Sequence, residues 1–258
     1  MKVIYISRKK VAKVLLVFSL VMISVLYSIN FGDSSIAVFL NTKKELPIYS
    51  VDVEDKRLAI SFDAAWGSEY TDEILRILEE RNIKCTFFLV GFWVDAHPDK
   101  VELIADKGHE IANHSTNHPH MSKLSRDQII KEIDTTQKRI EELAGNSAVK
   151  LIRPPYGDYN NLLIKTCDEL GFYPIQWDVD SLDWKELGVD HMYRQVTEKV
   201  KPGSIVLFHN NAKYTTQALP GILDKLLGEG YEFVPISQLI YKDNYYMDHN
   251  GMQKKNDS

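Results

Sequence analysis

Uncharged, mostly apolar residues run without interruption over 14–29, and the apolar character extends to Phe31. A basic cluster comes just before this run, at Arg8, Lys9, Lys10 and Lys13. About 20 apolar residues can span a bilayer, and flanking positive charge keeps that end in the cytoplasm. The pattern predicts a cytoplasmic segment over 1–13, a single-pass anchor in the cytoplasmic membrane over 14–31 and an extracytoplasmic catalytic domain. A cleaved signal peptide is the alternative, but the run exceeds the 7–15 residues typical of one.

Beyond a stalk predicted over 32–55, strand-like apolar runs alternate with segments of helical periodicity. The predicted strands are 58–64, 85–91, 110–115, 151–157, 173–180, 204–210 and 232–237. The predicted helices are 70–80, 98–107, 125–144, 160–170, 190–200 and 217–229. Strands that are apolar throughout indicate a sheet buried on both faces, and the alternation predicts parallel strands. These units define an α/β domain over 56–243, followed by a loose polar tail over 244–258.

The same alternation is compatible with a barrel or with a doubly wound sheet. No glycine-rich phosphate loop follows the first predicted strand, which disfavours a nucleotide-binding doubly wound fold. The formal net charge of −5 argues against a nucleic-acid partner, which needs a concentrated basic face. We expect Cys85 and Cys167 to be buried free thiols, although a disulfide between them is an open alternative.

Ionisable residues fall at or just beyond the C-terminal ends of the predicted strands. They are Asp63, His114, Arg153, Asp180 and His209. In an α/β barrel these strand ends open on one face, where active sites are built. We therefore expect the five side chains to converge, although each one alone has an ordinary structural explanation.

His114 and His118 have the spacing of residues on one helical turn. Two imidazoles at this spacing project to the same side and can bind one divalent ion. A pair of surface or capping histidines is the structural alternative. His120 offers a third nitrogen close by.

Asp63 has the chemistry of a general base, with the role of a metal ligand as the alternative. Arg153 has the chemistry of a partner which keeps a carboxylate ionised and oriented. His209 is placed to act as a general acid, with Asp180 orienting it and raising its pKa. The stiff Pro154-Pro155 turn would hold the Tyr156 backbone N–H toward a developing oxyanion. We expect the side chains of two further residues, Trp184 and Leu207, to wall an apolar slot for a small acyl group, with core packing as the alternative.

Five short motifs occur in order along residues 56–240. They read SFDAAWG (61–67), HSTNH (114–118), RPPYG (153–157), DSLDW (180–184) and LFH (207–209). With them the chain resembles the polysaccharide deacetylase family, also called the NodB homology domain or carbohydrate esterase family four. The membrane segment and the FDxxWG pattern are similar to the sporulation-associated PdaB-type subgroup.

The resemblance implies a distorted (β/α) barrel of about seven β/α units. It also implies a divalent metal, often zinc, held by His114 and His118. It implies that Asp63 is the catalytic base, that Arg153 orients it and that His209, supported by Asp180, is the catalytic acid. It also implies that Tyr156 supplies the oxyanion N–H and that Trp184 and Leu207 line the acetate pocket. The implied partner is peptidoglycan or a related N-acetylated glycan, and we expect a monomer. Position 64 departs from the family, since Ala64 replaces an aspartate that completes the metal site. The chain is therefore predicted to be either a deacetylase of cell-wall polysaccharide or a degenerate domain that binds glycan without turnover.

Overall fold

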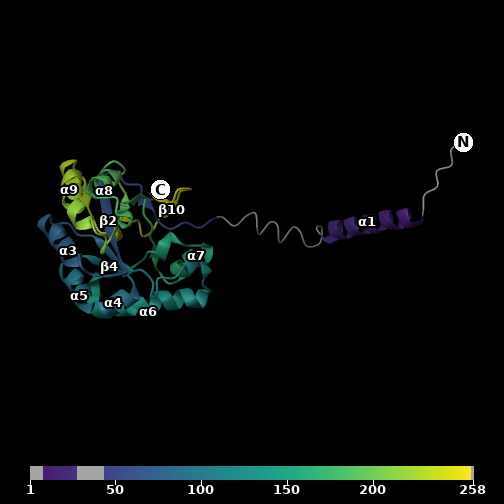
Figure 1. Ribbon diagram of the computed structural model, residues 1–258, viewed down its shortest axis with the longest axis horizontal. Helices are drawn as coiled ribbons and strands as arrows, with labels where there is room; N and C mark the ends of the chain where they lie inside the picture. Colours follow the sequence, from purple (N-terminus) through teal and green to yellow (C-terminus); the bar gives the residue numbers. More distant parts are fainter. Residues whose placement is uncertain (1–7, 28–43, 257–258) are drawn as a thin grey trace. The chain divides into compact units, whose positions relative to one another are not determined.

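The computed structural model describes residues 8–27 and 44–256. The chain divides into two compact units, residues 1–44 and 45–258. In the first unit, the described structure is the helix α1 (Arg8–Tyr27), drawn in purple in Figure 1.

The prediction of a single-pass membrane anchor over 14–31 is wrong by this structure. Within residues 8–27 and 44–256, none of the helices has the length and apolar character needed to span a bilayer. Helix α1 begins at Arg8, so its first turns hold the basic cluster and 14 of its residues, Val14 to Tyr27, are uncharged. At 1.5 Å per residue these cover about 21 Å, short of a hydrocarbon core of about 30 Å. The remainder of the predicted anchor, 28–31, lies outside the described residues.

The second unit is built on a curled sheet of parallel strands. The strands along it are β6 (Tyr173–Pro174), β5 (Ala148–Ile152), β4 (Glu110–Asn113), β3 (Thr86–Leu89), β2 (Arg57–Ala64), β8 (Ile205–His209) and β7 (Val179–Asp180). A further strand, β9 (Glu232–Phe233), pairs in parallel with β2. The parallel α/β prediction is confirmed, and the curl is that of a distorted barrel.

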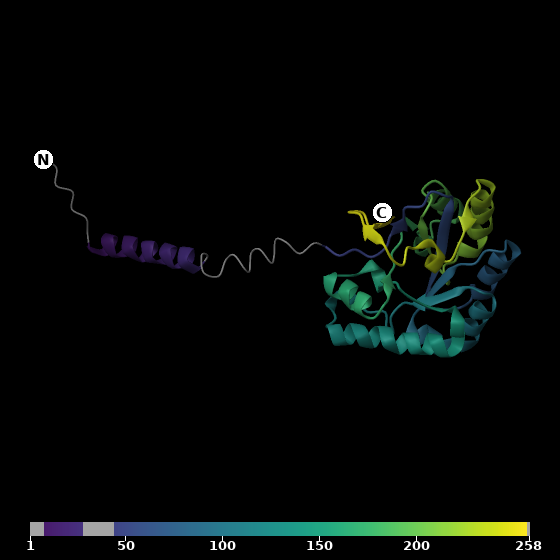
Figure 2. The ribbon, with the colours of Figure 1, turned by 180° about the vertical axis from the view of Figure 1, so that it is seen from behind.

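Helices connect these strands and cover the outside of the sheet (Figures 1 and 2). They are α3 (Thr71–Glu80), α4 (Gly91–Ala96), α5 (Pro98–Asp106), α6 (Arg126–Ala144), α7 (Asn161–Glu169), α8 (Val189–Thr197), α9 (Thr215–Gly228) and α10 (Ile236–Leu239). Six of them match the predicted helices, and α6 begins with the reciprocal capping contacts of Ser125 and Gln128. The sequence pattern missed the short helices α4 and α10, which directly follow strands.

The segment predicted as one strand over 173–180 forms two short strands instead. β6 pairs with β5 and β7 pairs with β8, so the two strands lie at opposite ends of the sheet order. Only residues 175–178 separate them along the chain. This segment therefore bridges the seam of the curled sheet in place of regular strand pairing.

Alternate residues of β2 face different cores. Leu58, Ile60 and Phe62 pack in the apolar cluster shared with the outer helices, whereas Ala59 packs in a second cluster with residues of β3, β4 and β8. Since side chains alternate along a strand, Asp63 lies on the same face as Ala59. The curled sheet thus directs Asp63 toward its interior.

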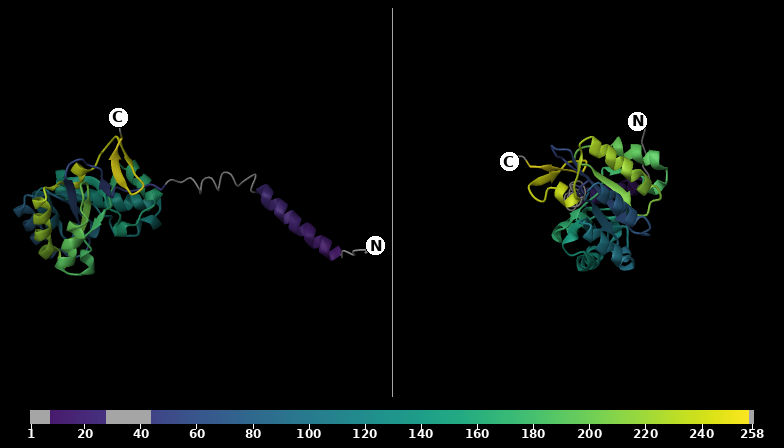
Figure 3. Two further views of the ribbon diagram at one scale, coloured as in Figure 1. Left: turned by 90° about the horizontal axis from the view of Figure 1, so that it is seen from above. Right: turned by 90° about the vertical axis from the view of Figure 1, so that its left-hand side faces the viewer.

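Residues at both ends of the second unit form a small separate sheet. β1 (Ser50–Val51) pairs with β11 (Met252–Lys255), which pairs with β10 (Tyr245–Met247). Figure 3 shows the antiparallel hairpin of β10 and β11, drawn in yellow, projecting from the unit. The Gln253 side chain is fully buried and bonds both the N–H and the carbonyl of Tyr241. Residues 45–55 and 244–256 are therefore part of the folded unit and not a stalk and a loose tail, because satisfied polar groups anchor them. The parts of the predicted stalk and tail at 32–43 and 257–258 lie outside the described residues.

Candidate active site

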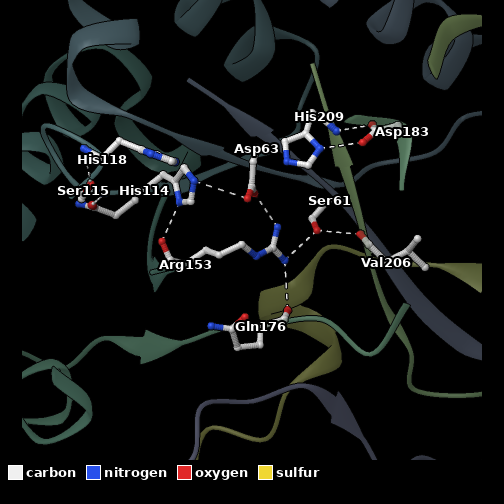
Figure 4. A network of polar contacts seen from close by, with 11 residues as sticks. Ser61, Asp63, His114, Ser115, His118, Arg153, Gln176, Asp183, Val206 and His209 are labelled. Carbon is white, nitrogen blue, oxygen red and sulfur yellow. Dashed lines mark hydrogen bonds and ion pairs between the residues drawn. The ribbon is translucent and has the colours of Figure 1, made fainter. Parts of the chain in front are cut away.

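Strand register brings the predicted acid and base together. Asp63 on β2 and His209 on β8 are direct partners in the parallel ladder. Asn113 on β4 is paired with Ile152 on β5, so the next residues along each strand, His114 and Arg153, also lie side by side. The four side chains converge at the C-terminal ends of two strand pairs, β2–β8 and β4–β5, with β3 lying between the pairs (Figure 4).

The Arg153 guanidinium binds the Asp63 carboxylate. Its Nη1 donates to Asp63 Oδ1 over 2.6 Å, and its Nη2 donates to Ser61 Oγ and to the Gln176 carbonyl oxygen. Arg153 is fully buried and Asp63 is 6% exposed. Burial alone would raise the pKa of Asp63, but the charge and hydrogen bond of Arg153 outweigh it and keep that pKa below its ordinary value. Asp63 is therefore an ionised carboxylate with one oxygen, Oδ2, turned from the guanidinium.

His114 presents a defined nitrogen to Asp63. Its Nδ1 lies 2.7 Å from the Arg153 carbonyl oxygen, which accepts a hydrogen bond and therefore fixes the proton on Nδ1. Its Nε2 lies 3.5 Å from Asp63 Oδ2. Burial lowers the pKa of His114 more than the Asp63 charge raises it, so the ring is neutral with a free lone pair on Nε2.

His118 reaches the site through a strained loop and not through a helical turn. Ser115 and His118 both have left-handed backbone angles, φ 67° and 55°. Such angles are uncommon for non-glycine residues and persist where the surroundings enforce them. The Glu132 carboxylate on α6 does so by accepting from Thr116 N and from the backbone and side chain of Asn117.

The two imidazoles lie together, but a third metal ligand is missing. The ring centroids of His114 and His118 are 4.9 Å apart, and burial lowers the pKa of His118 to about 4. His120 stacks on Tyr156 and lies beside Asp158. Across residues 8–27 and 44–256, no three His, Cys, Asp or Glu side chains are grouped so as to hold a metal ion. A catalytic zinc takes three protein ligands, so the residues present do not fit the expected zinc site.

Ala64 accounts for the missing ligand. It ends β2 directly after Asp63, is fully buried and packs in the apolar cluster shared with the outer helices. A methyl group cannot coordinate a cation. Ala64 therefore offers no ligand beside His114 and His118.

The carboxylate that supports His209 is Asp183, and the prediction of Asp180 for this role is wrong. Asp183 Oδ1 lies 2.7 Å from His209 Nδ1, and Asp183 Oδ2 accepts from His209 N and from Thr215 Oγ1. Desolvation would lower the pKa of His209, but the hydrogen bond and charge of Asp183 raise it above its ordinary value. Asp180 instead accepts from Leu182 N within its own turn, and its charge has a smaller effect on the His209 pKa than that of Asp183.

A cavity of about 550 Å³ opens over these groups. Its lining residues are Asp63, Ala65, Trp66, His114, His118, Pro154, Tyr156, Trp177, Asp180, Asp183, Trp184, Glu186, Leu207, His209, Asn211 and Ala212. All the predicted site residues except Arg153 are among them. Arg153 does not line the cavity, and it acts on the site through Asp63 and His114, which do.

Three of the predicted residues shape the cavity wall. Leu207 is buried in the wall at 3% exposure, while the Trp184 side chain is 57% exposed. Tyr156 has a left-handed backbone (φ 60°), and its ring packs against those of His118 and His120. The turn after Pro155 is therefore locally strained next to the cavity, which is typical of functional sites.

The family model described as polysaccharide deacetylase matches residues 50–175. A peptidoglycan-N-acetylglucosamine deacetylase of Bacillus cereus is 34% identical over 197 residues, which cover 74% of this chain and 92% of that protein. The chain belongs to the polysaccharide deacetylase family. The resemblance read from the five motifs is thereby confirmed, while the PdaB-type subgroup stays a prediction.

Two further relatives differ in how they are described. The uncharacterized protein YlxY of Bacillus subtilis is 32% identical over 79% of this chain, and the chain spans 63% of its length. The structure of BA3943 from Bacillus anthracis, described as a CE4 family pseudoenzyme, is 36% identical, with a TM-score of 0.72 over 76% of this chain and 69% of that one. A mutant of BA3943, 37% identical, is described as having restored enzymatic activity.

Several residues of this polysaccharide deacetylase site escaped the sequence prediction. Asp183 lies in the quoted DSLDW motif, but the strand-end pattern favours the first aspartate of that motif, Asp180. Ser61 and Gln176 hold Arg153, and no sequence pattern marks a serine or a backbone carbonyl as its partner. Trp66, also within a quoted motif, lines the cavity.

Proposed function

We propose that this chain hydrolyses N-acetyl groups of cell-wall polysaccharide, releasing acetate and leaving a free amine on the sugar. The observation that carries the proposal is the pairing of Asp63 with Arg153 opposite that of His209 with Asp183, on one cavity. Arg153 keeps one carboxylate ionised and Asp183 favours the protonated form of one imidazole, and these are the states that a general base and a general acid need.

The residues of the chain supply a complete proton path. Asp63 Oδ2 takes a proton from a water molecule as its oxygen bonds to the acetamide carbonyl carbon. The developing oxyanion faces the turn at Tyr156, whose backbone N–H is the proposed donor. The carbon–nitrogen bond then breaks as His209 gives its proton to the leaving amine, and Leu207 and Trp184 contact the acetyl methyl.

The proposed steps rest on the side chains and backbone of this chain, because His114 and His118 do not complete a three-ligand metal site. In the wider family, an aspartate at the position of Ala64 adds an anionic ligand. Its replacement favours slow turnover, with catalysis resting on Asp63, His209 and backbone donors. The sugar would be an N-acetylglucosamine or N-acetylmuramic acid unit of peptidoglycan, as the names of the relatives suggest. A role in spore-wall formation rests on the subgroup resemblance.

A second function is favoured by one specific observation, the buried methyl of Ala64. The domain would then bind N-acetylated glycan in the same cavity and support wall assembly without turnover. BA3943, which has a comparable fold, is described as a pseudoenzyme of the CE4 family. The retained Asp63–Arg153 and Asp183–His209 pairs argue against this alternative, since a binding site needs neither a base nor an acid.

Acetate release from peptidoglycan and from N-acetylglucosamine oligosaccharides tests the proposal. The full chain should release acetate, and Asp63→Asn should not. Binding of the same sugars without acetate release would establish the second function in place of the first.

A further inference from the structure

Trp66 has no part in the proton path, yet it stands exposed at the cavity. It follows β2, lines the cavity and is 57% exposed. Its ring lies edge-on to His118, with centroids 5.1 Å apart, and tilted toward Phe92 at 6.3 Å. Most of the indole surface is therefore open to a ligand that occupies the cavity.

The backbone beside Trp66 is fixed from two sides. The Gly67 carbonyl oxygen accepts from Trp93 Nε1 at 2.7 Å and from Asn210 Nδ2 at 2.9 Å, and both donors belong to buried residues. Gly67 has φ +61°, a left-handed backbone angle that residues with a side chain rarely adopt. The loop is thus pre-organised, so little conformational entropy is lost when a ligand contacts the indole.

A second exposed tryptophan lines the same cavity. Trp184 is also 57% exposed, and its backbone N–H donates to Asp183 Oδ1, which holds His209. Trp66 lies next to His118, whereas Trp184 follows Asp183, the residue that binds His209. A ligand whose acetamide lies at Asp63 therefore has one indole near each side of the reacting group.

The exposed indole rings of Trp66 and Trp184 are suited to binding a sugar chain. A pyranose ring has an apolar C–H face and a rim of hydroxyl groups. An indole covers such a face and removes it from water, while the rim stays hydrated. A cavity of about 550 Å³ also has room for more than one acetamide group.

We propose that Trp66 forms a binding subsite for a second sugar unit, next to the unit that carries the reacting acetamide. The class of ligand, an N-acetylated pyranose chain, rests on the proposed function. The subsite makes the chain select oligosaccharides over monosaccharides. Trp66 contributes by stacking on the neighbouring ring, and His118 supports its edge.

Calorimetric titration of the full chain with N-acetylglucosamine oligosaccharides of one to five units tests the subsite. In an Asp63→Asn background, which blocks turnover, affinity should rise with length. Trp66→Ala should weaken binding of the pentasaccharide roughly tenfold, because covering one indole face accounts for about one order of magnitude in an equilibrium constant. Trp66→Phe should retain part of the affinity. Tyr246→Ala is the matched control, since Tyr246 is 50% exposed on β10 outside the cavity lining.

A direct readout separates stacking from a general structural effect. In fluorotryptophan-labelled protein, the ¹⁹F signal that is missing in Trp66→Phe belongs to Trp66, and the pentasaccharide should shift it. Unchanged pentasaccharide affinity in Trp66→Ala, an unmoved signal, or failure of the chain to bind any of these sugars would overturn the subsite. Length-dependent binding that requires Trp66 without acetate release would uphold the subsite while rejecting hydrolysis.

Discussion

Arg153 Nη1 donates to Asp63 Oδ1 over 2.6 Å, and this contact joins two side chains that are both almost completely removed from solvent. The pair sets the charge on the proposed base. It also makes each partner costly to remove, because a buried charge without its partner is strongly unfavourable.

Arg153→Ala should lower the free energy of unfolding by about 3–5 kcal/mol, since it leaves the Asp63 carboxylate buried and unpaired. Urea denaturation of the wild type and of Asp63→Ala, Arg153→Ala and the double variant measures the coupling. The double variant should be destabilised by less than the sum of the single variants. Strict additivity would mean that the two side chains do not support one another.

Removal of the Asp183 carboxylate should change the pH dependence of any turnover. The His209 pKa is raised in the fold, so the protonated acid persists to higher pH than for an ordinary histidine. Asp183 therefore stabilises the fold below the ordinary histidine pKa, and this contribution is lost as pH rises through the raised value. In Asp183→Asn the alkaline limb of the pH–rate profile should move to lower pH.

The matched control for Asp183 is Asp180→Asn. Asp180 contributes a charge but no hydrogen bond to His209, so its replacement should move the alkaline limb less. An equal or larger shift in Asp180→Asn would restore the assignment made from the sequence.

Ala64→Asp should create a zinc-dependent protein. Without a cation the new carboxylate is buried in an apolar layer, so the melting temperature should fall. Zinc bound by the introduced carboxylate together with His114 and His118 should reverse the loss, and ligand at about 100 times its Kd stabilises by about 2.7 kcal/mol. Differential scanning fluorimetry with and without zinc measures both effects.

Ala65→Asp is the control for this substitution, because Ala65 is the next residue along the chain and places the same carboxylate one position further on. It should respond weakly to zinc. A wild type that gains as much from zinc as Ala64→Asp would show that the native site already has its full ligand set.

Glu132 should stabilise the conformation of the loop that carries His118. Glu132→Ala removes the acceptor of three hydrogen bonds and should lower the free energy of unfolding by about 1–3 kcal/mol. The His114 and His118 side-chain NMR signals should shift as the loop relaxes. Glu142→Ala, on the exposed face of the same helix, is the control. Histidine signals that stay unchanged in Glu132→Ala would show that other contacts hold the loop.

Much of the fold followed from periodicity. The helix over 70–80 was predictable because Ile74, Leu75, Ile77 and Leu78 form one buried face. The split of 173–180 was not, because its two halves pair with strands distant in sequence. The C-terminal hairpin was missed because its anchor is the buried amide of Gln253, which is polar.

The site followed from strand ends, with two informative failures. Strand ends located Asp63, His114, Arg153 and His209, because parallel register places such residues at one level. Asp183 was missed because the chain reverses through Leu182, a non-glycine residue with φ 56° that sequence does not reveal. His118 reaches the site through left-handed angles and not through helical spacing.

The most direct test of the central claim is a matched assay of acetate and free amine on one batch of peptidoglycan. The full chain should produce the two in equal amounts, and Asp63→Asn and His209→Gln should each abolish both. Equal acetate release by wild type and Asp63→Asn, or no release by the wild type while it binds the polymer, would contradict the claim.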